Sequence, residues 1–574
     1  MDKKGILAII LTFLIIFGWS FIQSKLFPPE PVKEVKKEQV VPLEQKKETS
    51  EVKATLPKEV KSTSLMKQVP RKEVFVETQN YWAVLTNEDA RLSHFKLKKY
   101  KNRVKESPIT IKLTQFVEGI LGRKVEEPKE PEPLDLVNTN DVQGLPLGLS
   151  SQISFVAGNW EVDREKLILA TPGDSGEVTF QKNLENGLKV IKQYRFHPEN
   201  DIIDIEVEVQ NPTSKEMTLQ LGLEWVGKIE LAKLVDEGNK DFGLRYAFLK
   251  NDKVEKKEFG GARSGGCVPS CGPQNKTVQP FEFSDRGDIR WFSFGGEYFA
   301  AMLIPPSTAK DVTLSVKGDA KDILQATLSP TPSTVAPQQS IRIPYRVYLG
   351  PKAEKQLKAI GVGAEKLVDF GWFTIVAKPL LWFINLTHTV TKNFGIDIIL
   401  ISILIKIIFL PLTQISFKSM KEMQKVQPEM NRLRETYKND KARLQQEIML
   451  LYKRRKVNPM SGCLPMLIQI PVFIALYNAL QNAIEMRHAP FFLWIKDLSA
   501  KDPIYITPLI MGATMVIQQK MTPTSADPAQ AKMFMLMPIM FTFLFLNFPS
   551  GLVIYWLINN VLSIAHQYYL NKRG

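Results

Sequence analysis

The apolar run Ile396–Leu412, IDIILISILIKIIFLPL, carries one lysine near its middle, and this lysine constrains the fold more than any other residue. The run is long enough for most of a membrane span. A lysine at the centre of a bilayer costs roughly 2.5 to 3.5 kcal/mol, so Lys406 either snorkels to the headgroups, finds a partner or faces a water-filled cavity. Ser402 lies one helical turn earlier, on the same face. The two residues predict a short polar stripe on an apolar helix.

The N-terminal part of the chain predicts a membrane anchor followed by a tether. Residues 1–27 combine a short basic start with an apolar run, which favours an uncleaved signal-anchor transmembrane helix. A cleaved signal peptide is the alternative, because Gly18 and Ser20 are small residues at a suitable separation. Residues 28–70 are rich in Lys, Glu, Pro and Val and contain no aromatic residue. Such a segment cannot bury enough surface to order itself, so we expect a disordered charged tether.

Residues 71–350 change to short alternating segments such as Asp201–Gln210, DIIDIEVEVQ, separated by glycine and proline. Period-two alternation is typical of strands with one buried face, and this stretch is large enough for its own core. We therefore expect a large all-β sandwich. Because no nucleophile, metal-spacing or phosphate-loop motif stands out, we expect no catalytic residues, no metal, no cofactor and no enzyme.

A glycine-rich loop in this region holds two of the chain's cysteines, Cys267 and Cys271. If the domain lies outside the cytoplasm, these two residues could form a structural disulfide. A metal site is the weaker interpretation, since a lone CxxxC is a poor metal signal.

Two segments flank the apolar run of Lys406. Residues 364–394 mix aromatic and apolar residues with Lys378 and His388, which predicts an amphipathic helix lying in the membrane interface. Residues 413–460 are strongly basic, so we expect them in the cytoplasm. Their apolar residues recur at helical spacing on either side of a polar turn and predict an antiparallel helical hairpin. The hairpin is either a solvated connector or a docking site for an acidic partner.

Further apolar stretches follow toward the C-terminus. They cover Cys463–Leu480, Ile504–Gln518, Met533–Phe548 and Gly551–Ala565. With the two earlier runs they predict a polytopic α-helical membrane protein with six transmembrane helices, five of them in residues 395–574. The basic residues near the short loops and at the C-terminus place both chain ends in the cytoplasm and the β domain outside it. The same topology explains much of the net charge of +15, so we expect a lipid bilayer as partner and no specific nucleic-acid sequence.

Motifs from Gly371 to the end of the chain resemble the YidC family of membrane-protein insertases. These are PLT after the charged span (Pro411–Thr413), VNP (Val457–Pro459), GCLPMLIQIPVFIALY (Gly462–Tyr477), APFFLWIKDLS (Ala489–Ser499), MGATM followed by QKMTP (Met511–Pro523) and FPSGLVIYW (Phe548–Trp556). The tether and sandwich resemble the extra region of Gram-negative members, which have a large periplasmic domain. Where the family usually has Arg and a nearby Thr, this chain has Lys406 and Ser402, which keeps the charge but loses the guanidinium fork.

The resemblance implies a membrane protein insertase and chaperone of the bacterial inner membrane. Lys406 and Ser402 would line a hydrophilic groove, open to cytoplasm and lipid, that attracts the short polar tail of an incoming span. No bond would be broken. The apolar part of the substrate would slide along a set of apolar residues: Leu467, Phe473, Phe545, Tyr555 and Trp556. Each of these alone would be read as ordinary helix packing. The implied partners are nascent membrane proteins, the Sec translocon and a ribosome near the basic hairpin and the C-terminus.

Two other classes of function compete with this interpretation. A secondary transporter could use Lys406 to bind an anionic solute, although such transporters usually carry an internal repeat, and none is evident here. A membrane-anchored enzyme whose sandwich binds sugar is the third class. Insertion of a single-span substrate into liposomes, against solute flux, would separate the first two classes.

Overall fold

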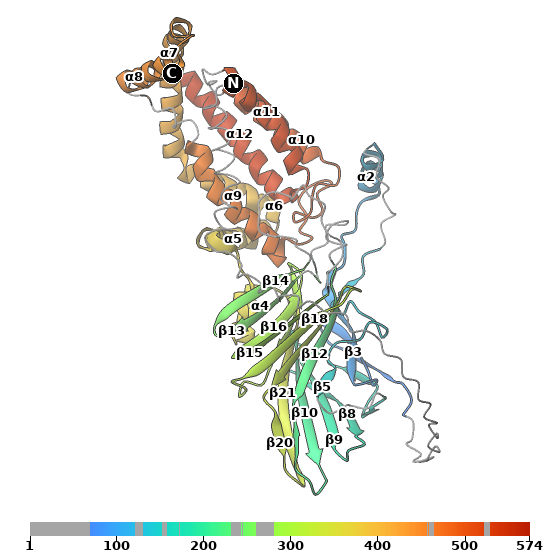
Figure 1. Cartoon of the computed structure of the whole chain (residues 1–574). Helices are drawn as coiled ribbons and strands as arrows, with labels where there is room; N and C mark the ends of the chain where they lie inside the picture. Colours follow the sequence, from blue (N-terminus) through green and yellow to red (C-terminus); the bar gives the residue numbers. More distant parts are fainter. Residues whose placement is uncertain are drawn as a thin grey trace, which may run out of the picture. The chain divides into compact units, whose positions relative to one another are not determined.

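The computed structural model describes residues 69–120, 130–151, 158–171, 173–230, 241, 243, 245–259, 280–455, 457, 464–521 and 528–573. The predicted N-terminal anchor, almost all of the predicted tether, and the loop with Cys267 and Cys271 lie outside these residues. Within the described part, a β-rich domain comes first and a set of helices follows it (Figure 1).

The largest sheet is antiparallel and forms the first layer of the β-rich domain. Its strands in the described part are, in order, β14 (Lys253–Glu258), β13 (Arg245–Lys250), β16 (Ile289–Gly295), β17 (Phe299–Ile304), β21 (Gln339–Pro351), β10 (Ile202–Asn211), β9 (Lys189–Phe196), β8 (Gly176–Asn183) and β6 (Glu161–Val162). Strand β10 alternates between buried and half-buried residues along its whole length, as the period-two pattern predicts. Its position between β9 and β21 pairs both of its edges.

A second antiparallel sheet packs on the first. It consists of β15 (Phe281–Gly287), β18 (Val312–Gly318), β19 (Ile323–Pro330), β12 (Leu221–Lys228) and β5 (Leu149–Ser151). The sheets approach closely at Gly227, where a Cβ atom would lie only 2.4 Å from the ring of Phe294. The Tyr345 hydroxyl also donates a 2.6 Å hydrogen bond across the layers to the carbonyl of Leu221. The two layers therefore form a sandwich around one apolar core.

Two smaller sheets complete the described part of the β-rich domain, and the sequence pattern did not predict them as separate sheets. They are a sheet of β4 (Pro133–Asp135), β3 (Arg91–Lys101), β2 (Tyr81–Thr86), β1 (Glu73–Glu77) and β7 (Lys166–Ile168), and a short pair of β11 (Met217–Leu219) and β20 (Ser333–Val335). Lys192 of β9 is fully buried and donates hydrogen bonds to the carbonyls of Ala90 and Leu147, which lie in the connections around β3. This lysine ties the extra sheet to the sandwich.

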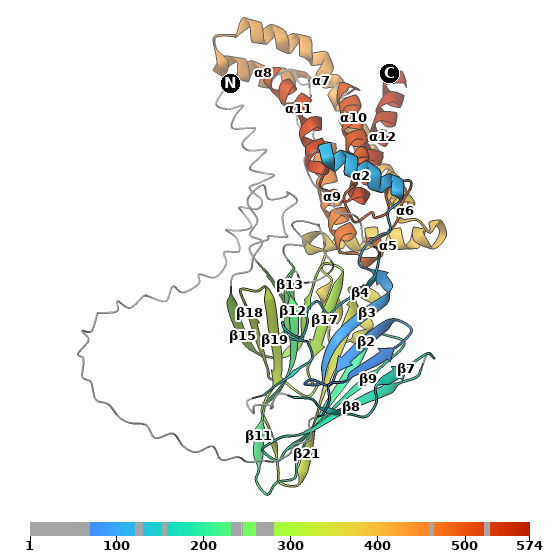
Figure 2. The same cartoon turned by 90° about the vertical axis from the view of Figure 1, so that its right-hand side faces the viewer.

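The helical part begins where β21 ends (Figure 2). Its elements are α4 (Glu354–Ile360), η1 (Ala364–Leu367), η2 (Gly371–Phe373), α5 (Thr374–Thr391), α6 (Phe394–Ile408), α7 (Leu410–Thr436), α8 (Lys441–Arg455), α9 (Leu464–Asn482), η4 (Ile484–Met486), α10 (Ile506–Met521), α11 (Pro528–Phe545) and α12 (Ser550–Arg573). A further helix, α2 (Pro108–Ile120), lies in the connection between β3 and β4.

Among the described residues, no single helix is both long and apolar enough to cross a membrane. Helices α6 and α7 meet that criterion together, with a bend of 58° between them. The predicted span Ile396–Leu412 is thus divided: α6 ends at Ile408, and α7 begins at Leu410 with Pro411 in its first turn. Proline lacks the amide hydrogen that would continue α6, so the helix breaks there.

Helix α5 has apolar residues on two faces. Ala377, Leu380 and Ile384 are buried in the core of the helical part. Four other apolar residues of α5 are exposed, at 87% for Ile375, 65% for Trp382, 49% for Leu386 and 84% for Val390. Helix α5 therefore has one face packed in the core and an exposed apolar stripe, and the interfacial position of residues 364–394 stays a prediction.

Helices α7 and α8 lie against each other through Val426, Met430 and Leu451, with Val457 closing the same small core. Their charged residues remain at the surface, and the Arg455–Glu429 ion pair joins the two helices. The residues that share helical spacing in the sequence are therefore the ones that pack.

Candidate functional site

Lys406 lies near the C-terminal end of α6 and is half-buried. Its Nζ atom donates a 2.6 Å hydrogen bond to Oγ of Ser563 in α12. Among the described residues, no carboxylate forms an ion pair with Lys406. The side chain therefore reaches a second helix instead of simply extending away from its own, and its charge is held by a neutral hydroxyl.

Helix α12 supplies a row of polar side chains beside this contact. Ser563 Oγ donates to the carbonyl of Asn559 at 2.7 Å, and Asn560 Nδ2 donates to Thr514 of α10 at 3.1 Å. One turn further on, both ring nitrogens of His566 are buried and find no hydrogen-bond partner among the described residues. Buried polar atoms without partners call for water or a ligand.

Ser402 does not take the role that its spacing predicts. Its side chain is fully buried, and Oγ donates a 2.6 Å hydrogen bond to the carbonyl of Ile398, one turn back on the same helix. A hydroxyl that bonds its own helix needs no neighbour. Ser563 is the hydroxyl that contacts Lys406, and the sequence offered a signal for it, because Asn559, Ser563 and His566 recur at helical spacing in an otherwise apolar segment.

The aromatic candidates gather in one cluster. The Phe473 ring lies 5.2 Å from Trp556 and 6.0 Å from Phe545, edge to face in both pairs. Phe545 is almost fully buried, while Phe473 and Trp556 are half-buried. Tyr555 is fully buried and accepts a hydrogen bond from Gln469 of α9. These residues join α9, α11 and α12, so their packing function is evident in the structure.

The side chain of Leu467 lies outside the described part. Its backbone belongs to α9, the helix that carries Phe473.

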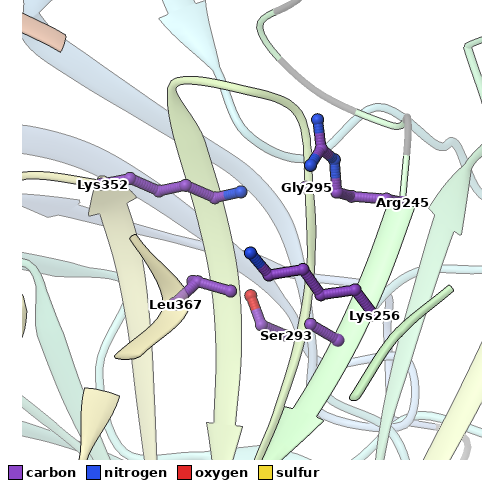
Figure 3. Close-up of a pocket in the computed structure, with 7 residues that line it drawn as sticks. Arg245, Lys256, Ser293, Gly295, Lys352 and Leu367 are labelled. Carbon is purple, nitrogen blue, oxygen red and sulfur yellow. The ribbon is translucent and has the colours of Figure 1, made fainter. Parts of the chain in front are cut away.

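A small cavity lies in the β-rich domain, lined by residues of β13, β14, β16 and the connector η1 (Figure 3). Lys352, Arg245 and Lys256 line it together with Ser293. Burial, reinforced by the nearby Arg245 charge, lowers the pKa of Lys352 to about 7. Each cation has its own partner: Lys352 donates to the Gly296 carbonyl, and the other two pair with carboxylates. The three cations therefore all have partners within the protein.

In the described part of the chain, no group of three or more His, Cys, Asp or Glu side chains is placed to hold a metal ion.

The fold defines a class of proteins in which a β-rich domain is followed by a set of helices with many exposed apolar side chains. Residues 386–574 match the family model described as 60Kd inner membrane protein, and residues 124–383 match the YidC periplasmic domain. A "Membrane protein insertase YidC" from Syntrophus aciditrophicus (strain SB) is 40% identical over 590 residues, covering 100% of both chains. One from Geobacter metallireducens is 37% identical and covers 100% of this chain and 98% of its own. The chain belongs to the YidC family.

A solved structure described as an active YidC insertase with its first transmembrane domain resolved is also similar to this chain. It is 19% identical, covers 87% of this chain and 92% of its own, and has a TM-score of 0.35. The family assignment rests on the sequence matches.

Proposed function

We propose that this chain is a membrane protein insertase in which Lys406 attracts the polar tail of an incoming hydrophobic segment. The observation that carries the mechanism is a half-buried cation that reaches from α6 to Ser563 of α12 and has no carboxylate partner among the described residues. The relatives that match the whole chain are named membrane protein insertases. Their names give no support to the transporter alternative.

The physical basis is the low dielectric around Lys406. Two opposite charges 4 Å apart attract by about 1 kcal/mol in water and by about 4 kcal/mol at an effective dielectric constant of 20. An acidic tail would therefore prefer this position to bulk water. Ser563 would keep the ammonium oriented between substrates, and water beside His566 would lower the cost of moving polar backbone past hydrocarbon. The step requires no bond to be broken.

The apolar part of the substrate would leave along the aromatic cluster of α9, α11 and α12. Phe473 and Trp556 are only half-buried, so each presents part of a ring for contact. Tyr555 and Phe545, being buried, would hold those rings in position. Leu467, on the same helix as Phe473, would extend this surface.

The chain is an inner-membrane protein with a periplasmic domain, as the two family models describe. We further propose six membrane crossings, with both chain ends in the cytoplasm. The supporting observations are the positive loops and the exposed apolar stripe of α5. In this topology the basic hairpin of α7 and α8 and the C-terminal end of α12 would face the ribosome. The Sec translocon would meet the chain within the membrane, and the β-rich domain would act as an accessory without catalysis.

The decisive experiment measures insertion into liposomes of one single-span client whose translocated tail carries zero, one or two acidic residues. Lys406→Ala should reduce insertion of the acidic members and spare the neutral one, while Lys406→Arg should retain the wild-type pattern. All variants must be reconstituted at equal levels. Equal insertion of every client by Lys406→Ala and wild type would mean that Lys406 only snorkels or packs.

A further inference from the structure

Helix α2 is an appendage of the β-rich domain that the proposed mechanism does not use. It occupies Pro108–Ile120, in the connection between β3 and β4. Ser107 begins the helix: its carbonyl accepts from the Ile111 amide at 3.0 Å, and its Oγ accepts from the Thr110 amide at 3.1 Å. A helix built with such an end is a defined element of the fold.

Helix α2 exposes an apolar face and buries polar residues, which is the reverse of a helix on the surface of a soluble domain. Its large apolar side chains are exposed: Ile109 by 72%, Leu113 by 43%, Phe116 by 67% and Ile120 by 71%. Their spacing of four, three and four residues places them on one face. The polar residues Thr110 and Glu118 are buried, with exposures of 3% and 8%. In water the opposite arrangement would be favourable.

The buried face of α2 is attached to the helical part of the chain. Tyr505 Oη donates a 2.8 Å hydrogen bond to Oε1 of Glu118. Tyr505 immediately precedes α10, which has its own exposed apolar residues, including Leu509 at 59% and Ile517 at 50%. The buried polar face of α2 is therefore tied to the start of a helix that also exposes apolar side chains, and the apolar stripe lies on the opposite face.

The exposed surface of α2 also carries a charge of one sign. Within the helix, the acid is Glu118, which is buried, and the base is Lys112, which is exposed. Lys105, just before the helix, is exposed as well and forms a 3.6 Å ion pair with the exposed Glu130. Cations beside an apolar stripe are the pattern of a helix that binds anionic lipid at the membrane surface.

We propose that α2 is a second interfacial helix, whose stripe Ile109, Leu113, Phe116 and Ile120 lies among the lipid acyl chains next to the start of α10. The occupant of this surface is lipid, with Lys105 and Lys112 toward anionic headgroups. The inference rests on the proposed membrane position of the helical part. It gives the β-rich domain its own contact with the bilayer, separate from the covalent link through α5.

The test uses the full chain with its cysteines replaced by serine and one new cysteine labelled with an environment-sensitive fluorophore. Phe116→Cys probes the stripe. Gln115→Cys is the matched control, since it is exposed on the same helix but about 100° around the axis. Leu509→Cys reports on α10. Each variant is placed in nanodiscs of phosphatidylethanolamine and phosphatidylglycerol, then quenched with spin-labelled lipid or with aqueous iodide.

Lipid quenching at Phe116 should exceed that at Gln115 by about twofold or more, and iodide should show the reverse order. If Leu509 is quenched by lipid while Phe116 behaves like Gln115, the inference about α2 fails and the proposed membrane position of α10 stands. If Leu509 is quenched only by iodide, the membrane position itself fails. A Phe116 probe shielded from both quenchers would show that protein, such as a second copy of the chain, covers the stripe, and would also overturn the inference.

Discussion

Arg487 is a buried cation and Lys406 is a half-buried one, and the two differ in the groups that surround them. Arg487, after η4, is only 8% exposed, and its guanidinium donates two hydrogen bonds to the carboxylate of Asp241, at 2.5 and 2.6 Å. It also donates to the Lys101 carbonyl at 2.7 Å and lies 5.1 Å from the Phe299 ring. Among the described residues, Lys406 has one hydrogen-bond partner, the hydroxyl of Ser563.

The difference separates a structural cation from one that can act on a substrate. Arg487 joins the loop after α9 to the β-rich domain, and its donors are used within the protein. A buried charge that is paired in this way holds two parts of the protein together. Lys406 retains donors for another molecule, because an ammonium group has three hydrogens and the observed contact uses one. Burial alone therefore does not identify a functional charge.

Removing the structural cation should have the largest effect. Arg487→Ala leaves Asp241 buried without its bidentate partner, so the free energy of unfolding should fall by about 3 to 5 kcal/mol. Thermal unfolding of the detergent-solubilised chain measures this loss. Arg290→Ala is the control, because its ion pairs are exposed and should contribute about 1 kcal/mol or less. Equal losses in the two variants would contradict the contrast between paired burial and exposure.

Reversing the charge of Lys406 should affect function more than stability. Lys406→Glu should lower insertion of an acidic-tail client by about tenfold or more, because it repels what the lysine attracts. Thermal unfolding should change much less than in Arg487→Ala. Lys317→Glu, at an exposed position in β18, is the control for charge reversal. An unfolding loss as large as that of Arg487→Ala would make Lys406 a structural cation as well.

Lys352 is an intermediate case, buried but bonded to the neutral carbonyl of Gly296. Its pKa falls from 10.5 to about 7 on folding, so between these values the unfolded chain holds more protons. The free energy of unfolding should therefore rise with pH across this window and be lowest below pH 7. Lys352→Met should flatten the rise, as measured by unfolding temperatures from pH 6 to 10. Lys317→Met should keep it; an unchanged slope in Lys352→Met would refute the assignment.

Removing the hydroxyl that holds Lys406 should have the smallest effect. Ser563→Ala keeps the cation, so insertion of an acidic-tail client should fall by about twofold, and the preference for acidic tails should persist. Ser402→Ala should reduce insertion less, because its hydroxyl bonds the Ile398 carbonyl. A larger loss in Ser402→Ala than in Ser563→Ala, in the same liposome assay, would reverse the assignment of the two serines.

The sequence predicted features that depend on a single helix or strand. It missed contacts between side chains that lie far apart in the chain. Lys406 was identifiable because a charge in an apolar run is costly wherever the other helices lie. Helical spacing grouped Ser402 with Lys406, but spacing does not reveal that the Ser402 hydroxyl bonds the carbonyl of Ile398. The hydrogen bond between Lys406 and Ser563 joins residues 157 positions apart in the sequence, and the Arg487–Asp241 ion pair joins residues 246 positions apart.

The β-rich domain shows the same limit. Alternation predicted strands such as β10, and the structure contains them. The separate sheet that contains β3 could not be assigned from the sequence, because its strand order depends on long-range pairing, including the parallel pair of β1 and β7. Helix α2 escaped notice because its exposed apolar stripe resembles an ordinary core-facing stripe until the burial of each residue is known. The local sequence pattern predicts a helix or a strand, while packing decides which of its faces is buried.

The break between α6 and α7 has a mechanical consequence. Phe409 is the single residue between the two helices, and Lys406 lies in the last turn before it. Helix α7 is 27 residues long and is stiffened by its packing on α8. A force applied to the far end of the hairpin of α7 and α8 would rotate α7 about the 58° bend between α6 and α7. The last turn of α6, which carries Lys406, lies next to this bend. A load on the basic hairpin would therefore be transmitted as torque to Lys406.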